Sequence, residues 1–129
     1  MKTEKPLLIG VSDVFFYTKI RDAFRPKGYA LERLRKQEDL IEKISSLQPL
    51  AVILNMNDEQ LDSTATLQTL KGHEAYKHIP ILAFANHEEV ETWRQAKDLG
   101  INKIVSRNEF SARTLELVEE LIGHGSNSS

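Results

Sequence analysis

Short apolar segments alternate with amphipathic segments along most of this sequence, and this alternation restricts the fold more than any other feature. Segments with the length of buried strands occur at residues 6–11, 29–34, 50–54, 79–85 and 101–105. After each of them, apolar residues recur at the spacing of one helix face. Strands and helices that alternate in this way form a parallel sheet with crossover helices on both faces. The sequence therefore predicts an α/β fold with five strands and five helices.

The order of the strands indicates where a functional site would lie. Residues 50–54 are apolar on both faces, as in a central parallel strand covered by helices on each side. We expect the flavodoxin-like order 2-1-3-4-5, in which ligands bind at the carboxyl ends of the strands, near the point between strands one and three. The residues at these strand ends are Ser12, Asp13, Asn55, Met56, Asn57, Asp58, Ala85, Asn86, Ser106 and Arg107.

Local signals predict where several helices begin. Residues 14–24 form an amphipathic helix. The third helix begins at Asp62 or Ser63, because both residue types cap helices well. Asn86, followed three residues later by Glu89, resembles a capping box at the start of the fourth helix.

Composition excludes several classes of protein. The length of 129 residues predicts one domain, which we place at residues 1–122, with a disordered tail at 123–129. The absence of cysteine excludes disulfides and thiolate chemistry. A net charge of −2 argues against nucleic acid as the partner. The longest apolar run, residues 50–54, is too short to span a membrane, and no signal peptide is readable, so we expect a cytoplasmic protein.

Two stretches carry a resemblance to a known family. Residues 76–82 resemble the apolar-x-Pro-apolar-apolar start of the fourth strand of response-regulator receiver domains. Residues 98–107 resemble the Gly-Ala-x-x-apolar-apolar-x-Lys pattern around their fifth strand. The resemblance extends over most of the chain. It implies a receiver-like, flavodoxin-like fold and a role in two-component signal transduction.

The resemblance also implies a reaction, in which an aspartate at the end of strand three accepts a phosphoryl group with the help of Mg²⁺. The corresponding position here is Asn55. The acidic pair that holds the metal in the family corresponds to Ser12 and Asp13. The hydroxyl residue that ends strand four corresponds to Ala85, and the lysine that ends strand five to Arg107. The aromatic switch residue of strand five corresponds to Ile104.

These replacements all weaken the implied chemistry. The neutral amide of Asn55 is a poor nucleophile and cannot form an acyl phosphate. Mg²⁺ prefers anionic oxygen ligands, and the set is reduced to Asp13, which stays a weak candidate ligand. The guanidinium of Arg107 is not equivalent to a lysine ammonium. We therefore expect a pseudo-receiver that lacks enzymatic activity, cofactor and metal, and that works as a phosphorylation-independent interaction module.

Three alternatives remain open at this point. The first is a working phosphoacceptor of a phosphorelay with a rearranged site at Asp58 or Asp13. The second is a flavodoxin-like small-molecule binder, which is disfavoured because no glycine-rich loop follows the first strand. The third concerns Asp13 alone, which either pairs with Arg107 across the strand ends or caps a helix locally.

The resemblance implies protein partners of a signalling pathway, with a homodimer as a second option. The family uses its fourth helix, fifth strand and last helix for such contacts, here residues 88–121. The candidate contact residues are Trp93, Glu116, Glu119 and Glu120. A second charged region, at residues 21–36, is rich in basic side chains. It forms either a basic face for an acidic partner or a solvated surface. We expect neither nucleic acid nor membrane as a partner.

Overall fold

The computed structural model describes the backbone of residues 5–126 and the side chains of residues 5–123. Five parallel strands form one sheet in the order β2-β1-β3-β4-β5, which confirms the predicted fold class and strand order. The strands are β1 (Lys5–Gly10), β2 (Tyr29–Arg33), β3 (Ala51–Asn55), β4 (Ile81–Ala85) and β5 (Lys103–Ser106). The α-helices are α1 (Val14–Phe24), α2 (Leu40–Leu47), α3 (Ser63–Lys71), α4 (Val90–Asp98), α5 (Arg107–Ala112) and α6 (Thr114–Ser126).

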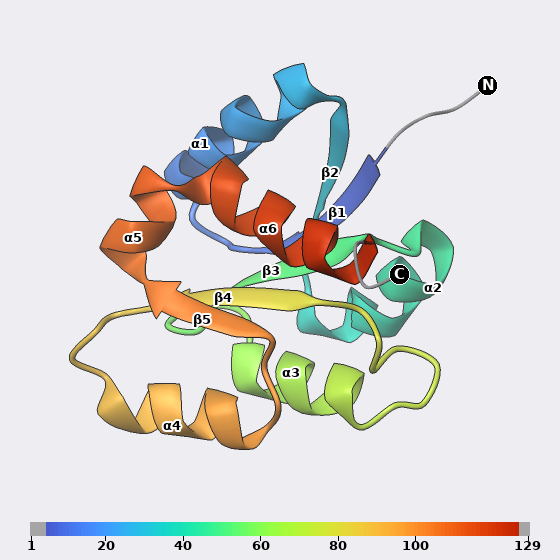
Figure 1. Cartoon of the computed structure of the whole chain (residues 1–129). Helices are drawn as coiled ribbons and strands as arrows, with labels where there is room; N and C mark the ends of the chain where they lie inside the picture. The colour runs from blue at the N-terminus through green and yellow to red at the C-terminus, as the bar shows by residue number, and fades with distance from the viewer. Residues whose placement is uncertain (1–4, 127–129) are drawn as a thin grey trace.

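Helices cover both faces of the sheet. Figure 1 shows α1 and α6 on one face and α3 and α4 on the other. One core lies under α1 and α6 (the α1–α6 core), and the other lies under α2, α3 and α4 (the α2–α4 core). Successive residues of a strand point to opposite faces, so Leu7 and Ile9 belong to the α1–α6 core and Leu8 to the α2–α4 core. All three side chains are at most 1% exposed. The sheet is thus buried on both sides, and only the strand ends and the two edges are open to other molecules.

Helix α1 begins and ends where the sequence predicts. Phe16, Ile20 and Phe24 lie at i, i+4 and i+8 and are its buried residues. The Asp13 side chain caps the helix by accepting hydrogen bonds from the backbone N of Phe15 and Phe16, at 2.9 and 3.1 Å. The cap fixes the direction in which the chain leaves β1.

Helix α5 is an element that the prediction of five helices missed. It follows β5 directly, and its N-cap Ser106 accepts a hydrogen bond from the backbone N of Glu109 at 3.0 Å. Phe110 holds it on the core: its side chain is fully buried, and its ring stacks on Phe84 at 4.5 Å between centroids. Serine followed three residues later by glutamate is itself a capping signal. The sequence therefore contained evidence for this helix.

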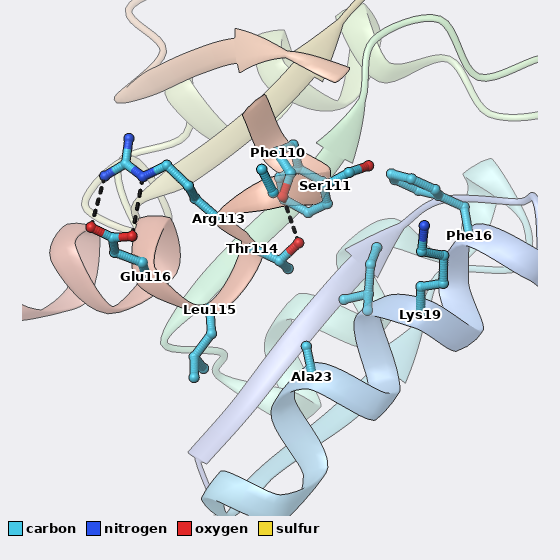
Figure 2. Close-up of a pocket in the computed structure, with 11 residues that line it drawn as sticks. Phe16, Lys19, Ala23, Phe110, Ser111, Arg113, Thr114, Leu115 and Glu116 are labelled. Carbon is cyan, nitrogen blue, oxygen red and sulfur yellow. Dashed lines mark hydrogen bonds and ion pairs between the residues drawn. The ribbon is translucent and has the colours of Figure 1, made fainter. Parts of the chain in front are cut away.

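A short joint separates α5 from α6. Arg113 leaves the helical conformation, at φ −132° and ψ 33°. The Thr114 hydroxyl then donates to the Phe110 carbonyl oxygen at 2.5 Å, as Figure 2 shows. The same joint and α1 enclose a cleft of about 400 Å³ with an apolar floor that includes Phe16 and Phe110. The joint turns the chain so that α6 can pack beside α1.

The structure confirms one prediction about where a helix begins and contradicts another. Asp62 is confirmed as the N-cap of α3, because its side chain accepts from the backbone N of Ala65 at 3.0 Å. The predicted capping box at Asn86 is wrong. Helix α4 begins at Val90, and its N-cap Glu89 makes no side-chain hydrogen bond to the helix. Trp93 instead donates from Nε1 to the carbonyl oxygen of Asn86 at 3.0 Å, which secures the loop before the helix.

The last helix runs to Ser126, past the expected domain end at residue 122. Gly123 lies within it, at a cost of about 1 kcal/mol relative to alanine that the helix accommodates. Residues 127–129 of the expected tail lie outside the described residues. Among the helices of residues 5–126, none is long and apolar enough to cross a membrane.

Candidate functional site

The loops after β1 and β3 and the start of α5 meet at the carboxyl edge of the sheet. They enclose a cleft of about 310 Å³. Its lining consists of Ser12, Asp13, Asn55, Asn57, Asp58, Glu59, Gln60 and Arg107. The structure therefore brings together four of the site positions predicted from the sequence, namely Ser12, Asp13, Asn55 and Arg107.

The two other predicted positions lie beside the cleft rather than in its lining. Ala85 ends β4, is 1% exposed and pairs in register with Ser106. Its methyl group offers no hydrogen bond where a hydroxyl would offer one. Ile104 lies on β5, where it is half-buried and packs against the α2–α4 core. Both positions therefore add apolar packing and no polar group.

Asn55 is the last residue of β3 and is only 6% exposed. Its side-chain Oδ1 accepts a hydrogen bond from the backbone N of Asn57 at 2.9 Å. Its backbone oxygen accepts from the Ser63 hydroxyl at 2.6 Å, which ties the strand end to α3. The amide of Asn55 thus serves as a structural acceptor that shapes the turn.

Asp58 joins the two loops that border the cleft. Its carboxylate accepts from the backbone N and the hydroxyl of Ser12, at 2.7 and 2.8 Å. It also accepts from the backbone N of Gln60 and Leu61, each at 2.9 Å. The sequence pointed to Asp58 only as a strand-end residue or displaced acceptor. The turn bonds to Gln60 and Leu61 have a local signal, an aspartate that starts a loop. The Ser12 bonds, which span 46 residues, have none.

These bonds determine the charge of Asp58. Burial acting alone would raise the pKa of its carboxyl. The hydrogen bonds from Ser12, Gln60 and Leu61 favour the ionised form and outweigh that effect, so the pKa lies below its ordinary value. At neutral pH the cleft therefore holds a carboxylate whose oxygens both accept hydrogen bonds from the protein itself.

Asp13 and Arg107 do not form an ion pair with each other. The Asp13 carboxylate caps α1, which confirms the alternative of a local cap. The Arg107 guanidinium lies over the rings of Phe16 and Phe84, at 4.6 and 5.8 Å from their centroids. A cation over an aromatic face is attracted by the electron density of the ring. Arg107 is thus held by the aromatic core, although it also borders the cleft.

The cleft residues do not fit Mg²⁺, the ion that this fold implies. Mg²⁺ demands octahedral geometry and is usually held by one or two carboxylates, with waters in the remaining positions. Two of the three carboxylates in the lining are already in use, Asp13 as a helix cap and Asp58 by Ser12 and its own loop, and the third, Glu59, is exposed. Ser12 points its donors at Asp58, so it offers hydrogens where a metal needs lone pairs. Across the described residues, no three histidine or acidic side chains converge as metal ligands would.

The acidic candidates for partner contact are engaged within the chain. Arg113 contacts Glu116 and Glu120 at 3.0 and 3.2 Å, and Figure 2 shows the two-pronged bond to Glu116. The Glu116 hydrogen bond, with the other carboxylates, raises the pKa of Arg113 further above its usual range. Glu119 accepts from the Tyr29 hydroxyl at 3.3 Å. Tyr29 belongs to β2, at the opposite edge of the sheet from β5, so Glu119 is held on the β2 side.

Trp93 lies on α4 and is half-buried. Its ring packs against the α2–α4 core while its Nε1 bonds to Asn86. Lys97 lies over the same ring, with Nζ 5.9 Å from the centroid. The structure therefore gives Trp93 a packing role and leaves part of the ring accessible.

No protein-family model matches the sequence, and no curated protein matches it significantly. Solved structures do resemble the fold. One is a response regulator of Chloroflexus aurantiacus, with a TM-score of 0.82 and 18% identity, covering 94% of this chain and 99% of that one. Another is the phosphorylated cyanobacterial phytochrome response regulator RcpA, with a TM-score of 0.78 and 12% identity, covering 98% and 97%.

A third similar structure is the receiver domain of the sensor histidine kinase PA1611 from Pseudomonas aeruginosa. It contains a magnesium ion in its active-site cleft and matches with a TM-score of 0.79 and 15% identity, covering 94% of this chain and 99% of that one. The TM-scores establish a shared backbone architecture, and the low identities leave the chemistry of each chain to its own residues. This chain has the fold of the response-regulator receiver domains.

Proposed function

We propose that this chain is a pseudo-receiver, a module of signal transduction that binds a protein partner without phosphorylation and without enzymatic activity. The observation that carries the proposal is Asn55. The residue ends β3 where the resemblance expects the phosphoacceptor, and it carries a neutral amide that bonds to the backbone N of Asn57. An amide nitrogen has no free lone pair with which to attack a phosphodonor.

The surroundings of Asn55 support the same conclusion. RcpA has been solved in its phosphorylated form and the PA1611 domain with magnesium. In this chain the metal position is crossed by hydrogen bonds between Ser12 and Asp58. Ala85 cannot donate to a phosphoryl oxygen. The acceptor carboxylate, one acid of the pair after β1 and the hydroxyl at the end of β4 are thus all replaced around one cleft, and their joint replacement supports loss of the reaction more strongly than one substitution would.

The Ser12–Asp58 bonds also favour a single conformation of the loops after β1 and β3. In a phosphorylated receiver, the modification would supply the charge that holds the loops together. Here Asp58 supplies a permanent negative charge to the loop after β1. We infer that the loops rest in one arrangement, so partner binding is constitutive.

The surface for this partner lies on α4 and β5. Val90 is 69% exposed, and Trp93 lies one helical turn further along the same helix. Residues three apart on a helix are neighbours, so the two side chains offer adjacent apolar area. Aromatic side chains are enriched among the residues that dominate interface energies. The partner is therefore a protein with a complementary apolar patch, either a different chain or a second copy of this one.

A phosphodonor assay tests the loss of chemistry. We expect no change in intact mass when the protein is incubated with Mg²⁺ and a small-molecule phosphodonor, while RcpA, treated in parallel, serves as the positive control. An adduct of about 80 Da, the mass of one phosphoryl group, would contradict the proposal. If the adduct then disappeared in Asp58→Asn, the alternative of a displaced acceptor would hold.

A second assay tests the partner surface. We expect proteins captured from a native lysate to be the same with and without the phosphodonor, and to be lost with Trp93→Ala. The control is Lys77→Ala, on the exposed loop between α3 and β4, where the side chain pairs with Glu74. Capture that required the phosphodonor would contradict a phosphorylation-independent role.

A further inference from the structure

Another cleft, of about 380 Å³ and distinct from the two described above, lies between α1 and the edge strand β2. It is lined by Tyr17, Arg21, Arg25, Gly28, Tyr29, Ala30 and Leu31. We name it the α1–β2 groove. Two of these residues are cations and none is an acid, although the whole chain has a net charge of −2. The groove is thus a local concentration of positive charge on a weakly acidic protein.

The cations of the groove lack full compensation. The Arg25 side chain makes no ion pair or hydrogen bond with any described residue. The Nε of Arg21 is buried and has no hydrogen-bond acceptor in the described chain. Its nearest acid is Asp22, at 3.5 Å, a contact without hydrogen-bond geometry. A buried donor without an acceptor is uncommon in a folded protein. These features favour a ligand that brings negative charge.

The aromatic faces of the groove are already covered by cations. The Arg33 guanidinium lies 5.3 Å from the centroid of the Tyr17 ring, and Lys5 Nζ lies 4.3 Å from that of Tyr29. A nucleic acid would need free aromatic faces on which its bases could stack. The groove therefore suits anionic side chains better than nucleobases.

Strand β2 forms one edge of the sheet, so no described strand pairs with its outer side. Tyr29 and Leu31 face the α1 side, whereas Glu32 faces α2 and bonds Lys43 there at 2.6 Å. A peptide that added to this edge would send every second side chain toward α1. Such side chains are about 6.8 Å apart in an extended peptide. Arg21 on α1 and Arg25, the C-cap residue of that helix, are four residues apart, which corresponds to about 6 Å along the helix axis.

We propose that the α1–β2 groove docks an extended acidic peptide segment of a partner protein. The segment pairs with the outer edge of β2 and places two carboxylates, two residues apart, on Arg21 and Arg25. This site is separate from the α4–β5 surface and does not depend on whether that surface binds a partner.

Fluorescence anisotropy with a labelled peptide tests the proposal. The peptide is an extended, β-prone sequence with glutamate at every second position, and its control carries glutamine at the same positions. We expect saturable binding of the glutamate peptide only. Binding should weaken by at least about tenfold in the double variant Arg21→Gln/Arg25→Gln, because two charge-assisted bonds are lost.

The matched control removes two positive charges outside both proposed surfaces, with Lys71→Gln/Lys77→Gln at the end of α3 and in the loop before β4, and should leave binding unchanged. Equal loss in both double variants, or equal binding of the glutamine peptide, would overturn the proposal. So would tighter binding of a single-stranded oligonucleotide or of phosphatidylserine vesicles than of the glutamate peptide. Circular dichroism of each variant shows that it is folded.

Hydrogen exchange tests the strand pairing separately. We expect the backbone amides of β2 to exchange more slowly when the glutamate peptide is bound, with no change in β5 at the other edge. Binding without protection of β2 would overturn the proposed docking geometry.

Discussion

The carboxylate of Asp58 accepts both hydrogen bonds that Ser12 can donate, from its backbone N at 2.7 Å and from its hydroxyl at 2.8 Å. The pair joins the loop after β3 to the loop after β1 at the mouth of the cleft. A receiver domain would need this space for a metal ion and a phosphoryl group. In this chain a permanent contact occupies it, and several measurable consequences follow.

Removing the Asp58 carboxylate should destabilise the fold. We expect Asp58→Ala to lower the free energy of unfolding by about 1–3 kcal/mol, because Ser12 loses its acceptor and the loop loses its turn bonds. Urea unfolding measures the change. Glu59→Ala is the control, since this exposed neighbour makes no hydrogen bond within the described chain and should leave the midpoint unchanged. Equal effects of the two variants would contradict a special role for Asp58.

The contribution of Asp58 to the free energy of unfolding should decrease as the pH falls. The pKa of its carboxyl is lower in the folded protein than the ordinary value of 3.8, so the folded state favours the ionised form. Its stabilisation is therefore complete above that value and is lost as the pH falls through the folded pKa. We expect the difference in unfolding free energy between the native chain and Asp58→Asn to be constant near neutral pH and to shrink below about pH 4. A difference that grows on acidification would refute the assignment.

Replacing Asn55 by an acid should lower the free energy of unfolding, and this cost should be larger at neutral pH than at acidic pH. The side chain is 6% exposed and shares its cleft with Asp13 and Asp58, so a carboxylate there is poorly solvated and repelled. We expect Asn55→Asp to cost about 1–3 kcal/mol at pH 7 and less at pH 4, where the acid is largely protonated. Asn57→Asp, at a half-buried site, is the control with a smaller expected cost. Denaturant unfolding at both pH values gives the comparison.

Gly10 should tolerate no side chain. A Cβ at this position would lie 2.8 Å from Cδ2 of Leu54, which is itself 1% exposed, so the buried leucine would have to shift within a packed core. We expect Gly10→Ala to lower the free energy of unfolding by about 1–3 kcal/mol through overpacking. Gly123→Ala is the contrasting variant, because nothing lies within 4 Å of its Cβ and alanine favours helix α6. If both variants had the same thermal midpoint, close packing at Gly10 would be ruled out.

The ion pairs around Arg113 should make a contribution that salt removes. Arg113 contacts Glu109, Glu116 and Glu120, all on the surface of α5 and α6. Exposed pairs are weak and are screened as the ionic strength rises. We expect Arg113→Ala to lower the thermal midpoint slightly at low salt, with a smaller difference at about 1 M salt. Arg94→Ala removes a simpler pair, with Glu91 alone, and should have less effect. A difference that is independent of salt would indicate lost packing instead.

Much of the architecture was predictable because its signals are local. Phe16, Ile20 and Phe24 repeat at helical spacing, and α1 has the predicted limits. The run that became β3 is apolar on both faces, which is sufficient to place it inside a parallel sheet. The failures were local as well. The signal at Asn86 was misleading because residues 87 and 88 form a turn and α4 begins only at Val90. The signal at Ser106 was overlooked, and with it α5.

The amino-acid order was enough to establish the α/β alternation and the presence of a neutral amide at the end of the third strand, because periodicity and residue identity can be read one segment at a time. The strand order was only expected by analogy with a fold type, and the folded sheet decided it. The contacts that give the cleft its character required the folded chain. Ser12 meets Asp58 across 46 residues, and Arg107 lies over Phe16 and Phe84 instead of pairing with Asp13. Such contacts depend on how separate loops and strands are brought together, and no local pattern encodes the partner that a polar side chain finds at that distance.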